Sequence, residues 1–127
     1  MIFGIGTDLC EIARIEAAYE RFGEHFPRKI LMPRELEDFQ RSKNKVRFLA
    51  MRFAAKEAIV KAMGTGFRQG IWLRDVGTYQ EPSGKPCVMF SDNARRKCDE
   101  FGAGEGFITL TDEAGMVAAF AVLLRKA

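Results

Sequence analysis

Histidine and cysteine are scarce in this chain of 127 residues, which contains one histidine and three cysteines. A site with several histidine ligands is therefore excluded, and a serine- or cysteine-based catalytic triad could use only His25. Cys10, Cys87 and Cys98 are odd in number and lack the spacing of metal ligands. We expect them to be reduced thiols in a cytoplasmic protein.

Long apolar runs are also missing. The first residues, MIFGIGTDL, contain neither a basic leader nor a stretch long enough to span a membrane, so we expect no signal peptide and no membrane anchor. The net charge of +3 favours anionic partners only mildly. Because 47% of the residues are hydrophobic and we find no repeat or linker, residues 1–127 are expected to form a single domain.

The stretch 47–66, RFLAMRFAAKEAIVKAMGTG, is the longest one with helical periodicity. Its apolar face, defined by spacings of three and four, comprises Val46, Ala50, Phe53, Val60 and Gly64. Glu57 interrupts this face, and an ionised carboxylate removed from water is costly unless it is paired or binds a metal. Two interpretations are open: an ion pair of Glu57 with Lys61 or Arg52 at the rim of the core, or a metal site.

The helix is expected to end at Gly64-Thr65-Gly66, because glycine suits the left-handed position beyond a helix. We expect this turn to leave bare backbone N–H groups and a hydroxyl near Glu57 and Lys61. A carboxylate, an ammonium group and a glycine-rich turn together indicate a site for a metal and a phosphate.

Residues 1–11 predict a strand with Gly4, Gly6 and Asp8 on one face. Glycine inside a strand usually marks a place where another group approaches closely. One interpretation is a bulge, with Asp8 capping the helix that follows. The other is a catalytic carboxylate near a strand end.

Residues 12–23 predict an amphipathic helix with Arg14 and Arg21 two turns apart on nearly the same line. These arginines form either a solvated face or a docking face for an acidic partner. A short helix is expected over Pro33–Arg41, because proline fits the first helical turn. The basic run that follows is either a solvated linker or a site for a phosphate remote from the chemistry; it contains Arg41, Lys43, Lys45 and Arg47.

The second half of the chain predicts two hairpins and one helix. Strands are expected over 75–80 and 86–90, and again over 107–111 and 116–124. Between the hairpins, Ser91 suits the N-cap of a helix that runs to Phe101. The last strand is apolar on both faces and is therefore buried or at an interface. The order of elements indicates an α+β fold, with a largely antiparallel sheet and a long central helix.

Two segments together resemble the signature of the holo-acyl-carrier-protein synthase family, the small 4′-phosphopantetheinyl transferases. GIGTDLCEIARIE places an arginine, Arg14, six residues after Asp8. RFAAKEAIVKAMGTG supplies the second motif, with Phe53, Ala54, Lys56, Glu57, Ala58, Lys61 and Ala62. Gly84-Lys85-Pro86 also matches, and the resemblance covers essentially the whole chain.

The resemblance implies transfer of the 4′-phosphopantetheine arm of coenzyme A to a serine of apo-acyl carrier protein, in fatty acid biosynthesis, with release of adenosine 3′,5′-bisphosphate. Asp8 and Glu57 would bind Mg²⁺ and, with Lys61 on the pyrophosphate, form the catalytic group. The coenzyme A site would comprise Lys43, Lys45, Arg47, Arg52, Gly64, Thr65, Gly66, Lys85 and Pro86. The face for acyl carrier protein would comprise Arg14, Arg21, Phe22, Phe26 and Arg28.

Three further points follow from the resemblance. The resemblance implies a homotrimer with active sites between subunits, as expected for family members of this length. The last strand, which is apolar on both faces, agrees with an interface. The serine proton would go either to Glu57 or to a metal-bound water. Many members carry a histidine near the C-terminal Ser-x-Ser motif where this chain has Asp112, so the role of Asp112 is open.

Two other classes of protein fit the sequence less well. A small basic nucleic-acid-binding module is disfavoured because the aromatic residues are mostly Phe in core-like positions. A non-catalytic carrier-binding subunit is disfavoured because Asp8, Glu57 and Lys61 are all present. We therefore expect neither nucleic acid nor a membrane as a partner.

Overall fold

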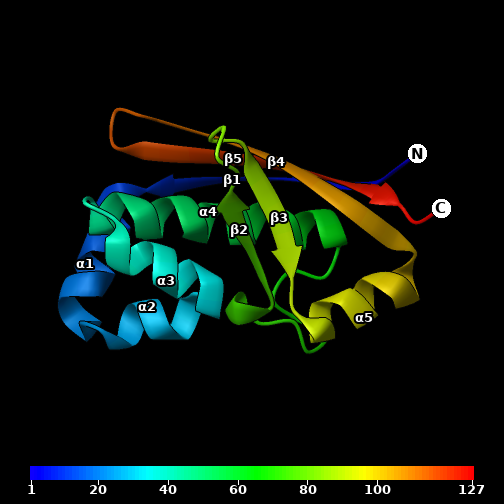
Figure 1. The fold of residues 1–127 in the computed structure, drawn as a ribbon, viewed down its shortest axis with the longest axis horizontal. Helices are drawn as coiled ribbons and strands as arrows, with labels where there is room; N and C mark the ends of the chain where they lie inside the picture. The colour runs from blue at the N-terminus through cyan, green and yellow to red at the C-terminus, as the bar shows by residue number, and fades with distance from the viewer.

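The computed structural model describes residues 1–127, and Figure 1 shows a three-stranded antiparallel sheet with one long helix, α4, lying along it. The elements are β1 (Ile2–Glu11), α1 (Ile12–Phe22), α2 (His25–Ile30), α3 (Pro33–Arg41), α4 (Lys45–Met63), the 3₁₀ turn η1 (Leu73–Asp75), β2 (Val76–Gln80), β3 (Pro86–Phe90), α5 (Asp92–Phe101), β4 (Ala103–Glu113) and β5 (Met116–Arg125). The sheet order is β1-β5-β4, and β2 and β3 form a separate antiparallel hairpin. This arrangement confirms the α+β class and the antiparallel pairing.

Two glycines let α4 lie directly against β1. A Cβ atom at Gly4 would lie 2.1 Å from the carbonyl oxygen of Ala62, and one at Gly6 would lie 2.0 Å from that of Ala58. The close approach expected at these glycines is thus confirmed, and the approaching group is the backbone of α4. A register shift between Ile2 and Gly4 fits the expected bulge. Capping by Asp8 is wrong, because no side chain caps α1.

Helix α4 is buried on nearly all sides rather than along one face. It begins at Lys45 and ends at Met63, where Gly64 adopts the expected left-handed conformation with a φ of 82°. The sheet covers one side, while α1 and α3 and the strand β2 cover others. Ala54, Lys56 and Ile59, which the single-face interpretation left outside the stripe, are therefore fully buried.

The turn after α4 does not offer bare N–H groups, so that expectation is wrong. The N–H of Gly64 donates to the carbonyl of Lys61, and those of Thr65 and Gly66 donate to the carbonyl of Val60. The Thr65 hydroxyl donates to the Gly66 carbonyl at 2.8 Å. These bonds satisfy the last carbonyls of the helix, which would otherwise lack partners.

Most helices and strands end where local sequence signals predict. The Ser91 hydroxyl accepts from the N–H of Ala94 at 3.0 Å, and α5 ends before Gly102 in the left-handed conformation. The chain enters β4 directly at Ala103, four residues before the expected strand, because no loop separates it from α5. Helix α2 was not expected; it accommodates Pro27 in its first turn, where an N–H has no helical partner anyway.

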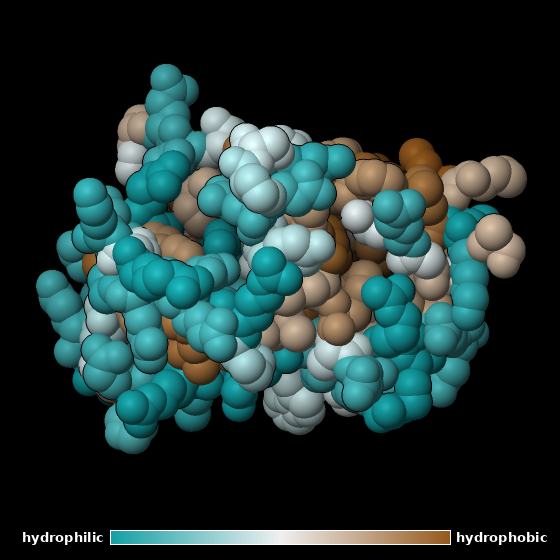
Figure 2. All heavy atoms as spheres, viewed as in Figure 1, coloured by the Kyte–Doolittle hydropathy of each residue, from teal (hydrophilic) through white to brown (hydrophobic).

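The two faces of the sheet differ. On the face toward α4, Val117, Ala121 and Leu123 of β5 are fully buried. We call the opposite face the outer sheet face; its large side chains are Ile5, Leu9, Phe107 and Phe120, with exposed fractions of 58%, 65%, 42% and 42%. Figure 2 shows a mostly hydrophilic surface over α1–α3 and apolar surface gathered around the β2–β3 hairpin and β4. Separately, none of the helices combines the length and apolar character needed to cross a membrane.

Candidate active site

The contact between β1 and α4 brings three predicted residues together. The Lys61 ammonium lies 3.3 Å from Oδ1 of Asp8 and donates to the carbonyl of Thr7 at 3.0 Å. Glu57, one turn before Lys61, has no ion-pair partner within 4.0 Å, because Lys61 faces Asp8 and Arg52 faces Glu35. The interpretation of Glu57 as half of a rim ion pair is therefore wrong.

The environment of Glu57 is unfavourable for its negative charge. Burial raises the pKa of the Glu57 carboxyl above its usual value, the charge of Asp8 raises it further, and Lys61 lowers it. Two carboxylates that repel each other are stabilised when a cation binds both. Their hard oxygen ligands suit Mg²⁺. No group of three or more His, Cys, Asp or Glu side chains is placed to hold a metal ion, so the remaining ligands of such an ion would come from water or substrate.

These carboxylates lie in a groove of about 330 Å³ between β1, α1 and α4. We call it the carboxylate groove; it is lined by Asp8, Leu9, Cys10, Arg14, Ile15, Ala18, Phe26, Phe53 and Glu57. Arg14 and Phe26, predicted from the family resemblance to contact the carrier, are thus at the same groove as Asp8 and Glu57. Arg21, Phe22 and Arg28 are exposed nearby in sequence but do not line it.

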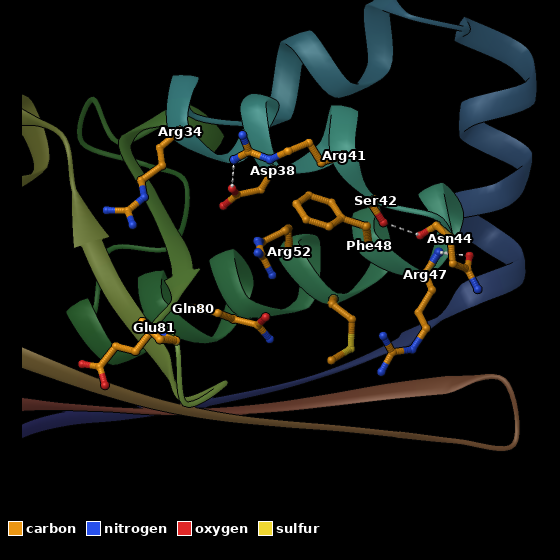
Figure 3. Close-up of a pocket in the computed structure, with 12 residues that line it drawn as sticks. Arg34, Asp38, Arg41, Ser42, Asn44, Arg47, Phe48, Arg52, Gln80 and Glu81 are labelled. Atoms are coloured by element: carbon orange, nitrogen blue, oxygen red, sulfur yellow. Dashed lines mark hydrogen bonds and ion pairs between the residues drawn. The ribbon is translucent and has the colours of Figure 1, made fainter.

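A second and larger groove, of about 720 Å³, lies between α3, the first half of α4 and the β2–β3 turn (Figure 3). We call it the arginine groove because Arg34, Arg41, Arg47 and Arg52 line it; the other lining residues are Asp38, Ser42, Asn44, Phe48, Met51, Gln80, Glu81 and Pro82. Arg41 is paired with Asp38 at 3.0 Å. The groove carries four arginines against two carboxylates, so it favours an anionic ligand.

Arg52 is the buried arginine of this groove. Its guanidinium lies 4.3 Å from the centre of the Phe48 ring, and its Nε atom lies 3.7 Å from Oε2 of Glu35. That Nε atom is buried and has no hydrogen-bond partner. Burial lowers the pKa of the guanidinium, whereas the charges of Glu35 and Asp38 raise it.

The predicted basic run divides into residues inside and outside the groove. Arg47 lines it, whereas Lys43 and Lys45 do not. The Lys45 ammonium donates to the carbonyls of Phe39, Gln40 and Ser42 at 2.6, 3.1 and 2.9 Å, so it satisfies the C-terminal end of α3. Lys43 is exposed and has no ion pair within 4.0 Å.

Asp112 is held by Arg47 rather than placed in the carboxylate groove. The guanidinium donates from Nε to Oδ2 and from Nη2 to Oδ1, both at 2.9 Å. This hydrogen bonding lowers the pKa of the Asp112 carboxyl and raises the pKa of Arg47. Asp112 therefore orients Arg47 at the edge of the arginine groove.

Lys85 and Pro86 line neither of these grooves, although the carbonyl of Lys85 accepts a hydrogen bond from the N–H of Glu81, which lines the arginine groove. They line a third hollow of about 270 Å³ between the β2–β3 hairpin and β4, together with Tyr79, Arg95 and Phe107, among others. Within one chain the structure thus brings Asp8, Glu57 and Lys61 together and does not bring Lys85 and Pro86 to them.

Sequence reasoning missed the buried charges. Glu35 and Lys56 are fully buried and paired with each other. Lys56 sits among Ala54, Ala55, Ala58 and Ile59, so a lysine surrounded by small apolar residues was the available signal. Arg52 and Lys56 are also one helical turn apart, which predicts that both face the same partner.

Comparisons with known proteins identify the family of the chain. The family model described as "4'-phosphopantetheinyl transferase superfamily" matches residues 4–121. The chain belongs to this superfamily. The holo-[acyl-carrier-protein] synthase of Halorhodospira halophila is 43% identical over 124 residues and covers 98% of each chain, and that of Vibrio cholerae is 42% identical over 126 residues, covering 99% of this chain and 100% of the relative.

Solved structures of the superfamily share the fold. The holo-[acyl-carrier-protein] synthase of Neisseria meningitidis superposes with a TM-score of 0.94 at 38% identity, covering 98% of this chain and 100% of that one. The synthase of Helicobacter pylori, solved in complex with coenzyme A, has a TM-score of 0.82 at 29% identity and covers 94% and 98% of the two chains. The 4′-phosphopantetheinyl transferase family named from the two sequence motifs is confirmed.

Proposed function

We propose that this protein transfers the 4′-phosphopantetheine arm of coenzyme A to a serine of apo-acyl carrier protein, in the cytoplasm and in support of fatty acid biosynthesis. The observation that carries the proposal is that Asp8 and Glu57 line one groove, with the Lys61 ammonium 3.3 Å from Oδ1 of Asp8. These residues stand at the family motif positions of a chain that belongs to the superfamily.

The reaction forms a bond between the serine oxygen and the β-phosphorus of coenzyme A. The bond from that phosphorus to the oxygen of the α-phosphate breaks, and adenosine 3′,5′-bisphosphate leaves. Lys61, which is half exposed and already beside Asp8, binds the pyrophosphate and offsets its charge. The serine proton has two candidate acceptors: the carboxylate of Glu57, whose raised pKa favours holding a proton, and a water in the groove.

Asp8 and Glu57 fit Mg²⁺, since they are hard ligands at one groove and since burial, and then the charge of Asp8, raise the pKa of Glu57. When bound, Mg²⁺ neutralises charge on the pyrophosphate and orients it for attack. Arg47 and Arg52 bind the 3′-phosphate of the nucleotide in the arginine groove, with the exposed Lys43 on its approach. Gly64, Thr65, Gly66, Lys85 and Pro86 line the remaining nucleotide surface.

Mass spectrometry tests the proposal directly. Apo-acyl carrier protein is incubated with this protein, coenzyme A and Mg²⁺, and the expected product carries one added phosphopantetheine. A carrier that stays unmodified, with folded protein and active reagents, would favour a non-catalytic subunit. A filter-retention assay with RNA and DNA at moderate salt tests for a nucleic-acid-binding module, because such a module would retain the nucleic acid on the filter.

The first mutational prediction concerns carrier docking. Reversing the charge of Arg14, which lines the carboxylate groove, is expected to raise the KM for acyl carrier protein about 5-fold, the equivalent of about 1 kcal/mol, with a smaller effect on the KM for coenzyme A. Association of the unaltered protein is also expected to weaken with salt, since screening acts over about 8–10 Å near physiological ionic strength.

Arg96→Glu is the matched control for docking, because Arg96 is an exposed arginine on another helix, α5. Steady-state kinetics with varied carrier should leave this control unchanged. A carrier KM that responds neither to Arg14→Glu nor to salt would remove the docking role of α1.

The second mutational prediction concerns assembly. We propose a homotrimer with active sites between subunits, supported by the apolar outer sheet face and by the separation of Lys85 and Pro86 from the carboxylate groove. Phe120 is 42% exposed at the middle strand of that face, so Phe120→Glu should dissociate the assembly and abolish most turnover. Light scattering measures the mass.

Phe22→Glu is the assembly control, because Phe22 is exposed on α1, away from the sheet. It should keep the mass of the unaltered protein. A fully active monomer of the unaltered protein would contradict the trimer and place the whole active site within one chain.

A further inference from the structure

Beneath the arginine groove lies a buried cluster of three charged side chains, Glu35 of α3 and Arg52 and Lys56 of α4. The Glu35 carboxylate accepts hydrogen bonds from the Lys56 ammonium, from the N–H of Met32 at 2.9 Å and from the N–H of Thr78 at 3.1 Å. Gly77 leaves room for it, since a Cβ atom there would lie 2.7 Å from Cδ of Glu35. The carboxylate therefore has a single, fully enclosed position between α3, α4 and β2.

The cluster has one negative and two positive charges. The Lys56 ammonium donates one hydrogen bond to Oε1 of Glu35 and another to the carbonyl of Val76 at 2.6 Å. Arg52 faces Oε2, but at 3.7 Å its Nε is too far for a hydrogen bond and has no other partner. One carboxylate cannot neutralise both cations, so positive charge remains on Arg52, the member that lines the groove.

The position of Arg52 is set from two sides. The Phe48 ring lies against its guanidinium at 4.3 Å, and the Glu35 charge attracts it from below. Figure 3 shows the Arg52 side chain in the space between α3 and α4, close to Phe48, rather than folded onto the surface. Glu35 thus holds the guanidinium without saturating its donors, which stay available to an anion in the groove.

We propose that Glu35, anchored by Lys56, is a positioning residue that holds the Arg52 guanidinium in the arginine groove for the 3′-phosphate of coenzyme A. This inference rests on the proposed function. The 3′-phosphate is the anion concerned because the pyrophosphate belongs at the carboxylate groove, whose lining shares no residue with the arginine groove. The competing view is that the cluster only joins α3, α4 and β2.

The direction of the change in anion affinity distinguishes a positioning role of Glu35 from a purely electrostatic one. Glu35→Gln and Asp38→Asn each remove one negative charge near the groove, and by Coulomb's law alone both should strengthen anion binding. If Glu35 positions Arg52, Glu35→Gln should instead weaken it. Asp38→Asn is therefore the matched control: Asp38 lines the groove and pairs with Arg41, not with Arg52.

The primary measurement is calorimetric binding of adenosine 3′,5′-bisphosphate and of adenosine 5′-monophosphate, which lacks the 3′-phosphate. For Glu35→Gln we expect about 10-fold weaker binding of the bisphosphate, little change for the monophosphate, and no weakening in Asp38→Asn. In turnover assays the KM for coenzyme A should rise while kcat and the KM for 3′-dephospho-coenzyme A change little. In Arg52→Met, adding Glu35→Gln should cause no further loss, because both act through one guanidinium.

Binding of the bisphosphate by Glu35→Gln as tight as in the unaltered protein, or an equal loss for both nucleotides, would overturn the inference. If Glu35→Gln does not fold, Glu35→Asp replaces it in the same comparison. Aspartate keeps the negative charge but places it one methylene further from Arg52, so we expect a smaller loss of the preference for the bisphosphate over the monophosphate. An unchanged preference would overturn the inference. Failure of the proposed function would look different: the unaltered protein would not modify apo-acyl carrier protein at all.

Discussion

Asp8→Ala and Glu57→Ala are each expected to lower kcat/KM for phosphopantetheine transfer about 30- to 1000-fold, which corresponds to about 2–4 kcal/mol of transition-state stabilisation. Both side chains line the carboxylate groove, and each would supply one of the two protein ligands for Mg²⁺. Removing a ligand leaves the charge of the pyrophosphate less neutralised at the moment of transfer. Thorough chelation should abolish activity in the unaltered protein, and added Mg²⁺ should restore it.

The same variants should remain folded, and this distinguishes a ligand from a core ion pair. Glu57 has no ion-pair partner, and its raised pKa means that its charge destabilises the folded state at neutral pH. Glu57→Ala should therefore keep or raise the midpoint of thermal unfolding in the absence of Mg²⁺. If Glu57 were a paired core carboxylate, the variant would lose stability and keep its activity per molecule.

The measurements are thermal unfolding and kcat/KM on the same samples, with Mg²⁺ titrated. Glu100→Ala is a suitable control, because Glu100 is an exposed glutamate on α5, outside the grooves described above. It should match the unaltered protein in both assays. Near-normal turnover in folded Glu57→Ala, or activity that survives chelation, would contradict the metal site.

Gly6→Ala is expected to lower the free energy of unfolding by about 3 kcal/mol or more, even though it adds one methyl group. The new Cβ would lie 2.0 Å from the Ala58 carbonyl oxygen and 2.7 Å from the N atom of Ala62. Both are backbone atoms inside α4, so no side chain can rotate away. The helix must move off the strand, which also separates Glu57 from Asp8.

Urea or thermal unfolding measures this effect, and Gly104→Ala provides the comparison. Gly104 is also in a strand, but a Cβ atom there would approach no atom closer than 3.2 Å. The comparison variant should lose about 1 kcal/mol or less. A Gly6→Ala protein within about 1 kcal/mol of the unaltered one would show that α4 can shift at little cost.

Elements with local signals were predicted from sequence. The left-handed glycine after α4, the serine cap of α5 and the alternating strands depend on neighbours in the chain, and all are found. The family motifs likewise identified the superfamily. Their assignment of Asp8 and Glu57 to a metal, and of Lys61 to the pyrophosphate, stays a prediction that the spatial convergence of the three supports.

Non-local contacts could not be predicted from the sequence. Glycine at Gly4 and Gly6 indicated a close neighbour, but which element it would be depends on the packing of the whole chain. The pairing of Glu35 with Lys56 requires α3 to lie across α4, and no local pattern fixes that arrangement. Lys45 resembled a phosphate ligand in a basic run, yet its ammonium is bound to the three carbonyls at the end of α3.

The direct contact of β1 with α4 also bears on how the protein tolerates mutation. No side chain separates the strand from the helix at Gly4 and Gly6, so the spacing of the backbones that carry Asp8 and Glu57 is set by main-chain atoms. Exchanges among larger core residues elsewhere can alter packing volume without widening or narrowing that spacing. Substitutions in the rest of the core therefore leave the separation of the two carboxylates unchanged, whereas substitutions at Gly4 or Gly6 alter it.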